Sequence, residues 1–121
     1  VNIGEDKMII KKLGDVPYED MSGYNNVTKQ ICVGPKDGSE EIVMRYFSVA
    51  PGGNTPYHNH GFPHLVKVEK GVGVAIDSDG KEHALTAGLM VYVQDDEVHG
   101  FRNTGDGPFD FICIVPQRGE A

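Results

Sequence analysis

Residues 52–71 read GGNTPYHNHGFPHLVKVEKG, and three histidines, His58, His60 and His64, fall close together in this stretch. A spacing of two places His58 and His60 on the same face of a strand, roughly 6.5–7 Å apart at the backbone. The glycine and proline that follow His60 favour a bend, after which His64 can face the first two from a neighbouring strand. Imidazole nitrogens so placed reach one ion at about 2.0–2.1 Å. The stretch therefore predicts a metal site between β-strands.

A fourth histidine, His99, lies far downstream and begins another expected strand after an acidic turn at 95–97. A single histidine is usually a packed or surface residue, but several imidazoles on converging strands have no comparable reason to be buried together. Neutral imidazole suits Zn, Cu, Fe and Ni and tolerates Mn. His83 has charged neighbours and is expected on the surface. We predict one divalent transition metal per chain (Mn, Fe, Zn, Ni or Cu), held by His58, His60, His64 and His99.

Short apolar runs separated by glycine and proline fill most of the chain. The runs are rich in β-branched and aromatic residues, so they predict an all-β fold, a sandwich or barrel of antiparallel sheets. Asp79-Gly80 predicts a hairpin turn with positive φ angles, and residues 16–21 are expected to form a short helical turn. The expected strands are Val27–Val33, Ile42–Val49, Leu65–Val68, Val72–Ile76, Met90–Val93, Val98–Arg102 and Phe109–Val115.

The length of 121 residues predicts a single domain over 1–121. A net charge of -7 with scattered basic residues argues against nucleic acid and anionic membranes as partners. No apolar run is long enough to span a membrane, and the first residues lack the features of a signal peptide. Cys32 and Cys113 form neither a CxxC pair nor a disulfide framework, so we expect reduced thiols and a cytoplasmic protein. The polar residues 1–25 are expected to form an extension able to reach a second subunit.

Two stretches resemble the sequence motifs of the cupin superfamily. Residues 52–71 follow the first motif, G-x5-H-x-H-x(3,4)-E-x6-G, with His64 in place of glutamate. Residues 88–103 follow the second, G-x5-P-x-G-x2-H-x3-N, with Gln94 for proline and Asp96 for glycine. The histidine at position 64 makes the chain similar to small single-domain cupins with four histidine ligands. The resemblance implies a double-stranded β-helix, or jelly-roll barrel, of two antiparallel sheets, with a metal inside it and commonly a homodimer.

The barrel interior is expected to supply pocket residues beside the metal. Alternation places Phe101 and Asn103 on the face of His99, with Phe101 as an apolar wall and Asn103 as a backbone tie. In Phe109–Val115, one face carries the apolar Phe111 and Cys113 and the other the apolar Ile112 and Ile114, so alternation leaves their direction open; the resemblance favours Phe111 and Cys113 inward. Cys113 is then either a small buried hydrophobe or a redox-sensitive group near the metal.

The strand around Arg45 is ambiguous in the same way. Its guanidinium either extends to solvent or points inward to bind an anion, and the resemblance favours an inward position beside Phe47. Tyr57 is expected to face away from the metal because neighbours on a strand alternate. Cys32 is expected to be an ordinary core residue.

Three functions fit these predictions. The first is a metal-dependent oxygenase, similar to the cupin dioxygenases, acting on a small organic substrate. The second is a Lewis-acid isomerase, which requires a general base, whereas no carboxylate is foreseen in the pocket. The third is a non-catalytic module that binds a metal or small ligand for sensing, so catalysis itself stays open at this point. Four neutral ligands leave the +2 charge of the metal uncompensated, which favours an anionic ligand.

Overall fold

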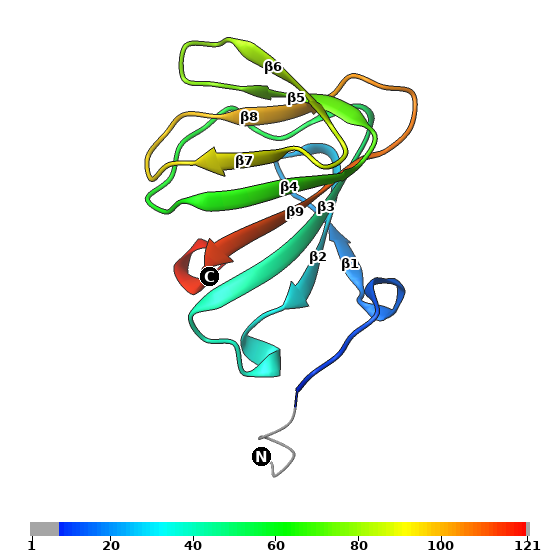
Figure 1. Cartoon of the computed structure of the whole chain (residues 1–121), viewed down its shortest axis with the longest axis vertical. Helices are drawn as coiled ribbons and strands as arrows, with labels where there is room; N and C mark the ends of the chain where they lie inside the picture. Colours follow the sequence, from blue (N-terminus) through cyan, green and yellow to red (C-terminus); the bar gives the residue numbers. More distant parts are fainter. Residues whose placement is uncertain (1–7, 121) are drawn as a thin grey trace.

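Antiparallel strands make up most of the computed structural model, which describes residues 8–120 (Figure 1). Short 3₁₀ turns cover Leu13–Asp15 (η2), Pro35–Asp37 (η3) and Gln117–Gly119 (η4). The strands are β1 (Tyr18–Asp20), β2 (Asn25–Val33), β3 (Ile42–Asn54), β4 (His64–Lys70), β5 (Val72–Ile76), β6 (Glu82–Thr86), β7 (Met90–Val93), β8 (Gly100–Asn103) and β9 (Phe109–Pro116).

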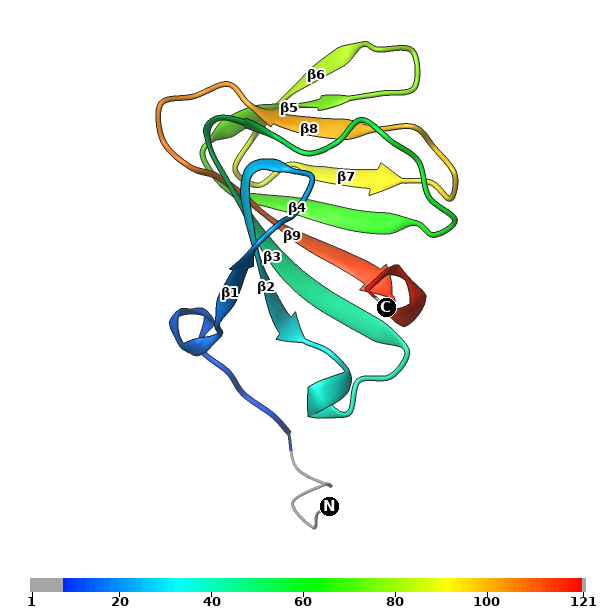
Figure 2. The same ribbon diagram turned by 180° about the vertical axis from the view of Figure 1, so that it is seen from behind.

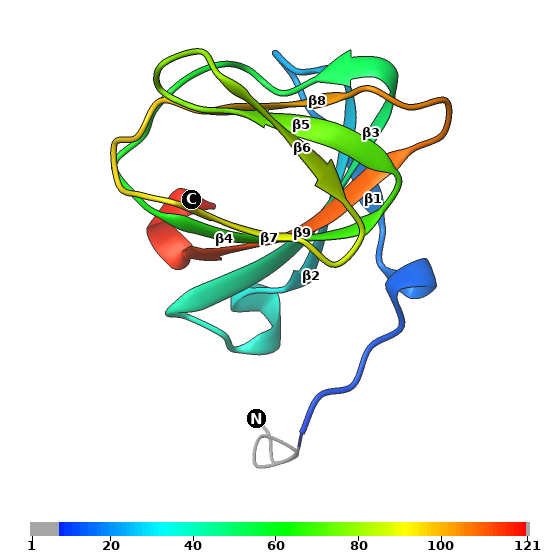
Figure 3. The ribbon, with the colours of Figure 1, turned by 45° about the horizontal axis from the view of Figure 1, so that its top comes forward.

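One continuous sheet connects all nine strands and curls into a barrel. Its order is β6-β5-β8-β3-β9-β4-β7, and β2 and β1 extend it from β3. Figure 3 shows that β5, β6 and β8 lie opposite β4, β7 and β9 across the barrel. The predicted all-β jelly-roll class is therefore confirmed, with two facing layers made from a single curled sheet.

The long strand β3 passes between the two layers. Its first part pairs with β9 from Ile42 to Val49, and its last residue, Asn54, pairs with Arg102 of β8. The glycines between these parts permit the bend, because Gly52 has a φ of +80° that favours glycine. A Cβ at Gly53 would lie 2.6 Å from the carbonyl oxygen of Asn25. This bend brings the residues that follow β3 across the barrel opening.

The inward faces of β3 and β9 form the centre of the core. Val43, Phe47 and Val49 of β3 are buried against the inward residues of β9. On β9 the buried, inward-facing side chains include Phe111 and Cys113. The alternation of this strand left its inward face open, and the structure agrees with the face that the resemblance favoured. Because side chains alternate along both strands, the same faces carry Arg45 and Cys113 into the interior.

Most expected strands form, with local differences. The helical turn expected at 16–21 is wrong: residues 18–20 form β1 against β2, and the 3₁₀ turn lies earlier in the chain. In the predicted hairpin, Gly80 has a positive φ and Asp79 does not. Gly80 N–H donates to the Asp77 carbonyl, so Ser78 and Asp79 are the central residues of the turn and Gly80 follows them. The strand β6 was not predicted, and β8 begins at Gly100, just after His99.

In the part of the predicted N-terminal extension that the structure describes, β1 pairs with the edge of β2, and the chain before it leads away from the barrel (Figure 2). Gln30 on β2 donates hydrogen bonds to the carbonyls of Leu13 and Val16, which fixes this segment to the same chain. Residues 1–7 lie outside the described part, and a contact of the extension with a second subunit stays a prediction. Over residues 8–120, no helix has the length and apolar character needed to cross a membrane.

Candidate metal centre

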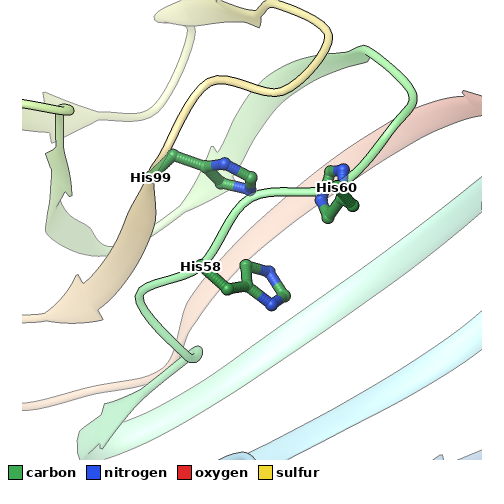
Figure 4. A group of neighbouring side chains, drawn as sticks. All are labelled: His58, His60 and His99. Carbon is green, nitrogen blue, oxygen red and sulfur yellow. The ribbon is translucent and has the colours of Figure 1, made fainter.

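Three of the predicted ligands meet at one end of the barrel. One ring nitrogen from each of His58, His60 and His99 lies within 4.8 Å of the other two. Figure 4 shows His58 and His60 on the segment between β3 and β4, and His99 on the segment that enters β8, all turned towards a common space. Three neutral nitrogens this close are a suitable partial ligand set for a divalent transition metal.

The backbone brings these histidines together in a way that differs from the prediction. His58 and His60 were expected on one strand, but residues 55–63 form no strand apart from an isolated bridge at His58. In that bridge, His58 N–H donates to the His99 carbonyl (3.0 Å) and His99 N–H donates back to the His58 carbonyl (2.9 Å). The two distant motifs are thus joined directly through main-chain hydrogen bonds at the ligand positions.

Backbone carbonyls fix the orientation of two of the rings. His60 Nδ1 lies 3.1 Å from the Phe62 carbonyl, and His99 Nδ1 lies 2.7 Å from the Glu97 carbonyl. A carbonyl can only accept, so each Nδ1 carries the proton and each Nε2 keeps a free lone pair. Metal-ligating histidines commonly donate their second ring N–H to a backbone carbonyl in this way. The Phe62 ring stacks on His60 with 3.9 Å between centroids, which limits rotation of the imidazole further.

His64 does not belong to the group of three but lies next to it. It begins β4, is 8% exposed, and its Nε2 is 2.8 Å from Nε2 of His60. If both nitrogens bound one ion at about 2.05 Å, a separation of 2.8 Å would correspond to roughly a right angle at the metal. The residues present therefore fit a metal, and the four-histidine set stays a prediction.

Cys113 determines which His64 nitrogen is free to bind. Its Sγ lies 3.2 Å from His64 Nδ1 and accepts a hydrogen bond from Arg45 Nη2 at 2.9 Å. When His64 Nδ1–H donates to sulfur, both facing Nε2 atoms of His60 and His64 have lone pairs, and a cation between them satisfies both. When the thiol donates instead, His64 Nε2–H donates to His60. Metal binding selects the first arrangement.

Burial favours the neutral form of His58, His64 and His99. Desolvation, followed by the neighbouring histidines, lowers the pKa of His64 to about 3. Desolvation also lowers the pKa of His58 and of His99. Neutral imidazole is the form that binds a metal, so these three residues need not release a proton at pH 7 before ligation.

A cavity of about 210 Å³ adjoins the histidines. All five predicted pocket residues line it, namely Arg45, Phe47, Phe101, Phe111 and Cys113. Phe111 packs on both other rings, with centroid distances of 5.4 Å to Phe47 and 5.0 Å to Phe101. Arg45 points inward and is buried, so its side chain lies beside the candidate metal rather than in solvent. The result is an apolar aromatic chamber with a cation in its wall.

Four residues outside the pocket were also assigned from the sequence. Asn103 ties backbone as expected: its Nδ2 donates to the carbonyls of Val49 and Gly107 at 2.8 Å. Tyr57 faces away, half exposed, and donates to the Asp77 carbonyl. His83 is exposed as predicted, whereas Cys32 is only partly buried and does not belong to the core cluster.

Sequence reasoning missed two charged residues in the pocket. Lys29 of β2 is buried there, and Glu120 after η4 contributes a carboxylate where none was foreseen. Lys29 shares an inward face with Val27, and this period of two was the signal that could have located it. Glu120 offered no such signal because it follows the last strand, and only the turn of η4 carries it back over the cavity.

Comparison with known proteins identifies relatives of the whole barrel. The family model for the cupin domain (Cupin_2) matches residues 45–115. A curated relative, the 1-methylthio-D-xylulose 5-phosphate methylsulfurylase of Rhodospirillum rubrum, is 29% identical over 112 residues. The alignment covers 93% of this chain, which spans 66% of the length of that relative.

Solved structures show the same architecture. The polyketide cyclase RemF from Streptomyces resistomycificus superposes with a TM-score of 0.86 at 26% identity, covering 91% of this chain and 80% of that one. A cupin 2 domain-containing protein from Halorhodospira halophila is 33% identical with a TM-score of 0.70, covering 82% of this chain and 68% of the other. The match to the family model over residues 45–115 includes both histidine segments.

Proposed function

Because this chain belongs to the Cupin_2 family of cupin domains, we propose that it is a metal-dependent enzyme acting on a small organic molecule bound inside the barrel. The observation that carries this proposal is the convergence of His58, His60 and His99 on the aromatic cavity, with two of the rings held by backbone carbonyls. We propose His64 as the fourth ligand, on the strength of its 2.8 Å separation from His60.

The reaction type that we favour is Lewis-acid catalysis. A dication with neutral ligands polarises an oxygen function of the substrate when it is bound. Phe101 and Phe111 restrict water around the substrate, and Arg45 adds positive charge to one wall. Two similar proteins are described as a polyketide cyclase and as a methylsulfurylase, and both names denote enzymes acting on small organic molecules.

A metal-dependent oxygenase is the second candidate. The histidine cluster is compatible with it, because imidazole ligands suit redox-active Fe and Cu as well as Zn. Oxygen uptake separates the two candidates: turnover of diketone or phenolic compounds with uptake of dioxygen supports the oxygenase, and turnover under anaerobic conditions supports Lewis-acid catalysis. Stable metal binding without turnover of any substrate would support the third function, a non-catalytic module for sensing. A homodimer and a cytoplasmic location stay predictions.

The metal content of purified variants tests the central claim. We expect His60→Ala to lose most of the bound metal, because it removes the ring that lies nearest to the other candidate ligands, while circular dichroism still reports a β-fold. His83→Ala is the matched control, since His83 is exposed and pairs with Asp77 away from the site. Elemental analysis by mass spectrometry gives the occupancy, and equal occupancy in wild type and His60→Ala would remove His60 from the ligand set.

A further inference from the structure

Two buried cations lie in the pocket beside the candidate metal. The side chains of Lys29 and Arg45 are 10% and 9% exposed, and they come from the paired strands β2 and β3. Both contact the carboxylate of Glu120, with Lys29 Nζ at 2.6 Å and Arg45 Nη1 at 3.4 Å. One carboxylate is therefore shared between two cations in the interior.

This arrangement leaves positive charge uncompensated. Arg45 Nε is buried without a hydrogen-bond partner among residues 8–120, and Arg45 Nη2 donates to the thiol of Cys113 rather than to an anion. Lys29 has a second acidic neighbour, Glu19 at 3.4 Å, but that side chain is 63% exposed and its charge is screened by water. Buried cations are costly unless paired, so Lys29 and Arg45 favour a bound carboxylate, whether Glu120 or a ligand supplies it.

We propose that Lys29 and Arg45 form a subsite for the carboxylate of an organic acid, and that Glu120 fills this subsite when no ligand is present. The inference deepens the proposed function, on which it rests for the metal at the other end of the ligand. Arginine and lysine are the residues that bind carboxylates through charge-assisted hydrogen bonds. The side-chain carboxylate of Glu120 is itself an example of the group that the subsite accepts.

The distance between the subsite and the candidate metal ligands limits the length of the ligand. One sulfur atom, Cys113 Sγ, separates Arg45 from His64, with 2.9 Å to Arg45 and 3.2 Å to His64. The Arg45 guanidinium also lies over the Phe47 ring, 5.0 Å from its centroid. A ligand that reaches from the cations to the metal therefore has a short apolar body, and an aromatic or unsaturated acid matches the rings of this cavity.

Glu120 belongs to a segment that can leave the subsite without unfolding the barrel. It follows η4, which packs at the barrel opening next to the segment before β4 (Figure 2). Among the described residues, two hydrogen bonds hold η4 there: Gln117 N–H donates to the Glu41 carbonyl at 2.9 Å, and Arg118 Nε donates to the Gly61 carbonyl at 3.4 Å. An incoming carboxylate replaces the Glu120 carboxylate on the same two cations, so charge is conserved in the exchange.

The test measures binding of benzoate to the metal-free protein by titration calorimetry, with the neutral amide benzamide as its match. We expect benzoate to bind and benzamide not to bind. Glu120→Gln should tighten benzoate binding about tenfold or more, because the competing carboxylate is removed while both cations remain. Lys29→Gln and Arg45→Gln should each weaken it about tenfold. Lys81→Gln changes the charge by the same amount on the exposed turn between β5 and β6, away from the cavity, and should leave the affinity unchanged.

Three results would overturn the proposal: benzoate binding no better than benzamide, an unchanged or lower affinity in Glu120→Gln, or tighter binding of phenyl phosphate than of benzoate, which would assign the subsite to phosphates. If the buried Lys29 or Arg45 variants fail to fold, Glu120→Gln against wild type decides alone. The measurement needs no metal, so loss of the metal site in the occupancy test and loss of this subsite are separate outcomes.

Discussion

Asp96 occupies a backbone position where glycine is expected. Its φ is +64°, in the left-handed region, and the cupin motif that the sequence resembles has glycine there. Its N–H donates to the His60 carbonyl (2.9 Å), so this turn supports the ligand segment. We predict that Asp96→Gly raises the free energy of unfolding by up to about 1 kcal/mol, because glycine adopts this φ without steric cost.

Urea denaturation measures this effect, and Asp95→Gly provides the control one residue earlier. Asp95 does not have a positive φ, so the same substitution there should lower stability through the added freedom of the unfolded chain. A similar loss of stability in both variants would show that the backbone of Asp96 is not strained.

His64 makes the stability of the metal-free protein depend on pH. Its pKa is lowered from 6.5 to about 3 by burial and by the other histidines. Between these values the unfolded chain binds a proton that the folded protein excludes, so stability is lost as pH falls from 6.5 towards 3. We predict that His64→Gln removes part of this dependence, up to about 1.4 kcal/mol per pH unit.

Unfolding free energies at pH 7, 6, 5 and 4, measured with a chelator present, test the prediction. The exposed His83→Gln is the control and should keep the wild-type slope below pH 6.5. Parallel curves for wild type and His64→Gln would mean that the pKa of His64 is the same in the folded protein and the unfolded chain, which would contradict its burial.

At the scale of elements, Asn103 joins the end of β8 to β3 and to the following loop. Besides its two donated bonds, its Oδ1 accepts the Gly105 N–H at 2.8 Å, and the side chain is buried. We predict that Asn103→Ala lowers the free energy of unfolding by roughly 2–4 kcal/mol, because the buried Val49 carbonyl loses its side-chain donor and the loop is released. Thermal and urea denaturation give the value.

The neighbouring Asn54 is the control for Asn103. Its side chain is only partly buried and bonds to Asn25 and to the Thr55 carbonyl at the surface, so Asn54→Ala should cost well under the amount for Asn103→Ala. Equal losses would indicate that the three bonds of Asn103 do not specifically stabilise the junction between β8 and β3.

The strands were predictable where the apolar pattern was strong. The direction of the side chains was not predictable in strands that are apolar on both faces. Residues 111–115 are apolar on both faces, so pairing with β3 and β4 determines that Cys113 faces inward. Histidine spacing identified the candidate metal ligands, but the geometry behind it was misread: a loop and a backbone bridge, rather than one strand, bring His58 to His99. Glu120 reaches the pocket through a chain reversal that leaves no periodic signal.

At the scale of the whole molecule, the candidate metal centre connects parts of the barrel that are distant in sequence. His60 lies on the segment before β4, and His99 on the segment before β8, in the opposite layer. A metal bound to both adds a link between the layers at the open end of the barrel, where the aromatic cavity reduces side-chain packing. The metal should therefore contribute to the stability of the fold as well as to chemistry.

We predict that chelation lowers the melting temperature of the metal-loaded protein and that added metal restores it. A ligand present at 100 times its dissociation constant stabilises the folded state by about 2.7 kcal/mol, which corresponds to a shift of roughly 10 °C for a domain of this size. Calorimetry with and without chelator measures the shift. His60→Ala should melt at the same temperature with and without chelator, because it lacks one of the histidines that hold the metal. The melting temperature of His83→Ala should shift like that of wild type. An equal shift in His60→Ala would show that the stabilising metal binds elsewhere in the chain.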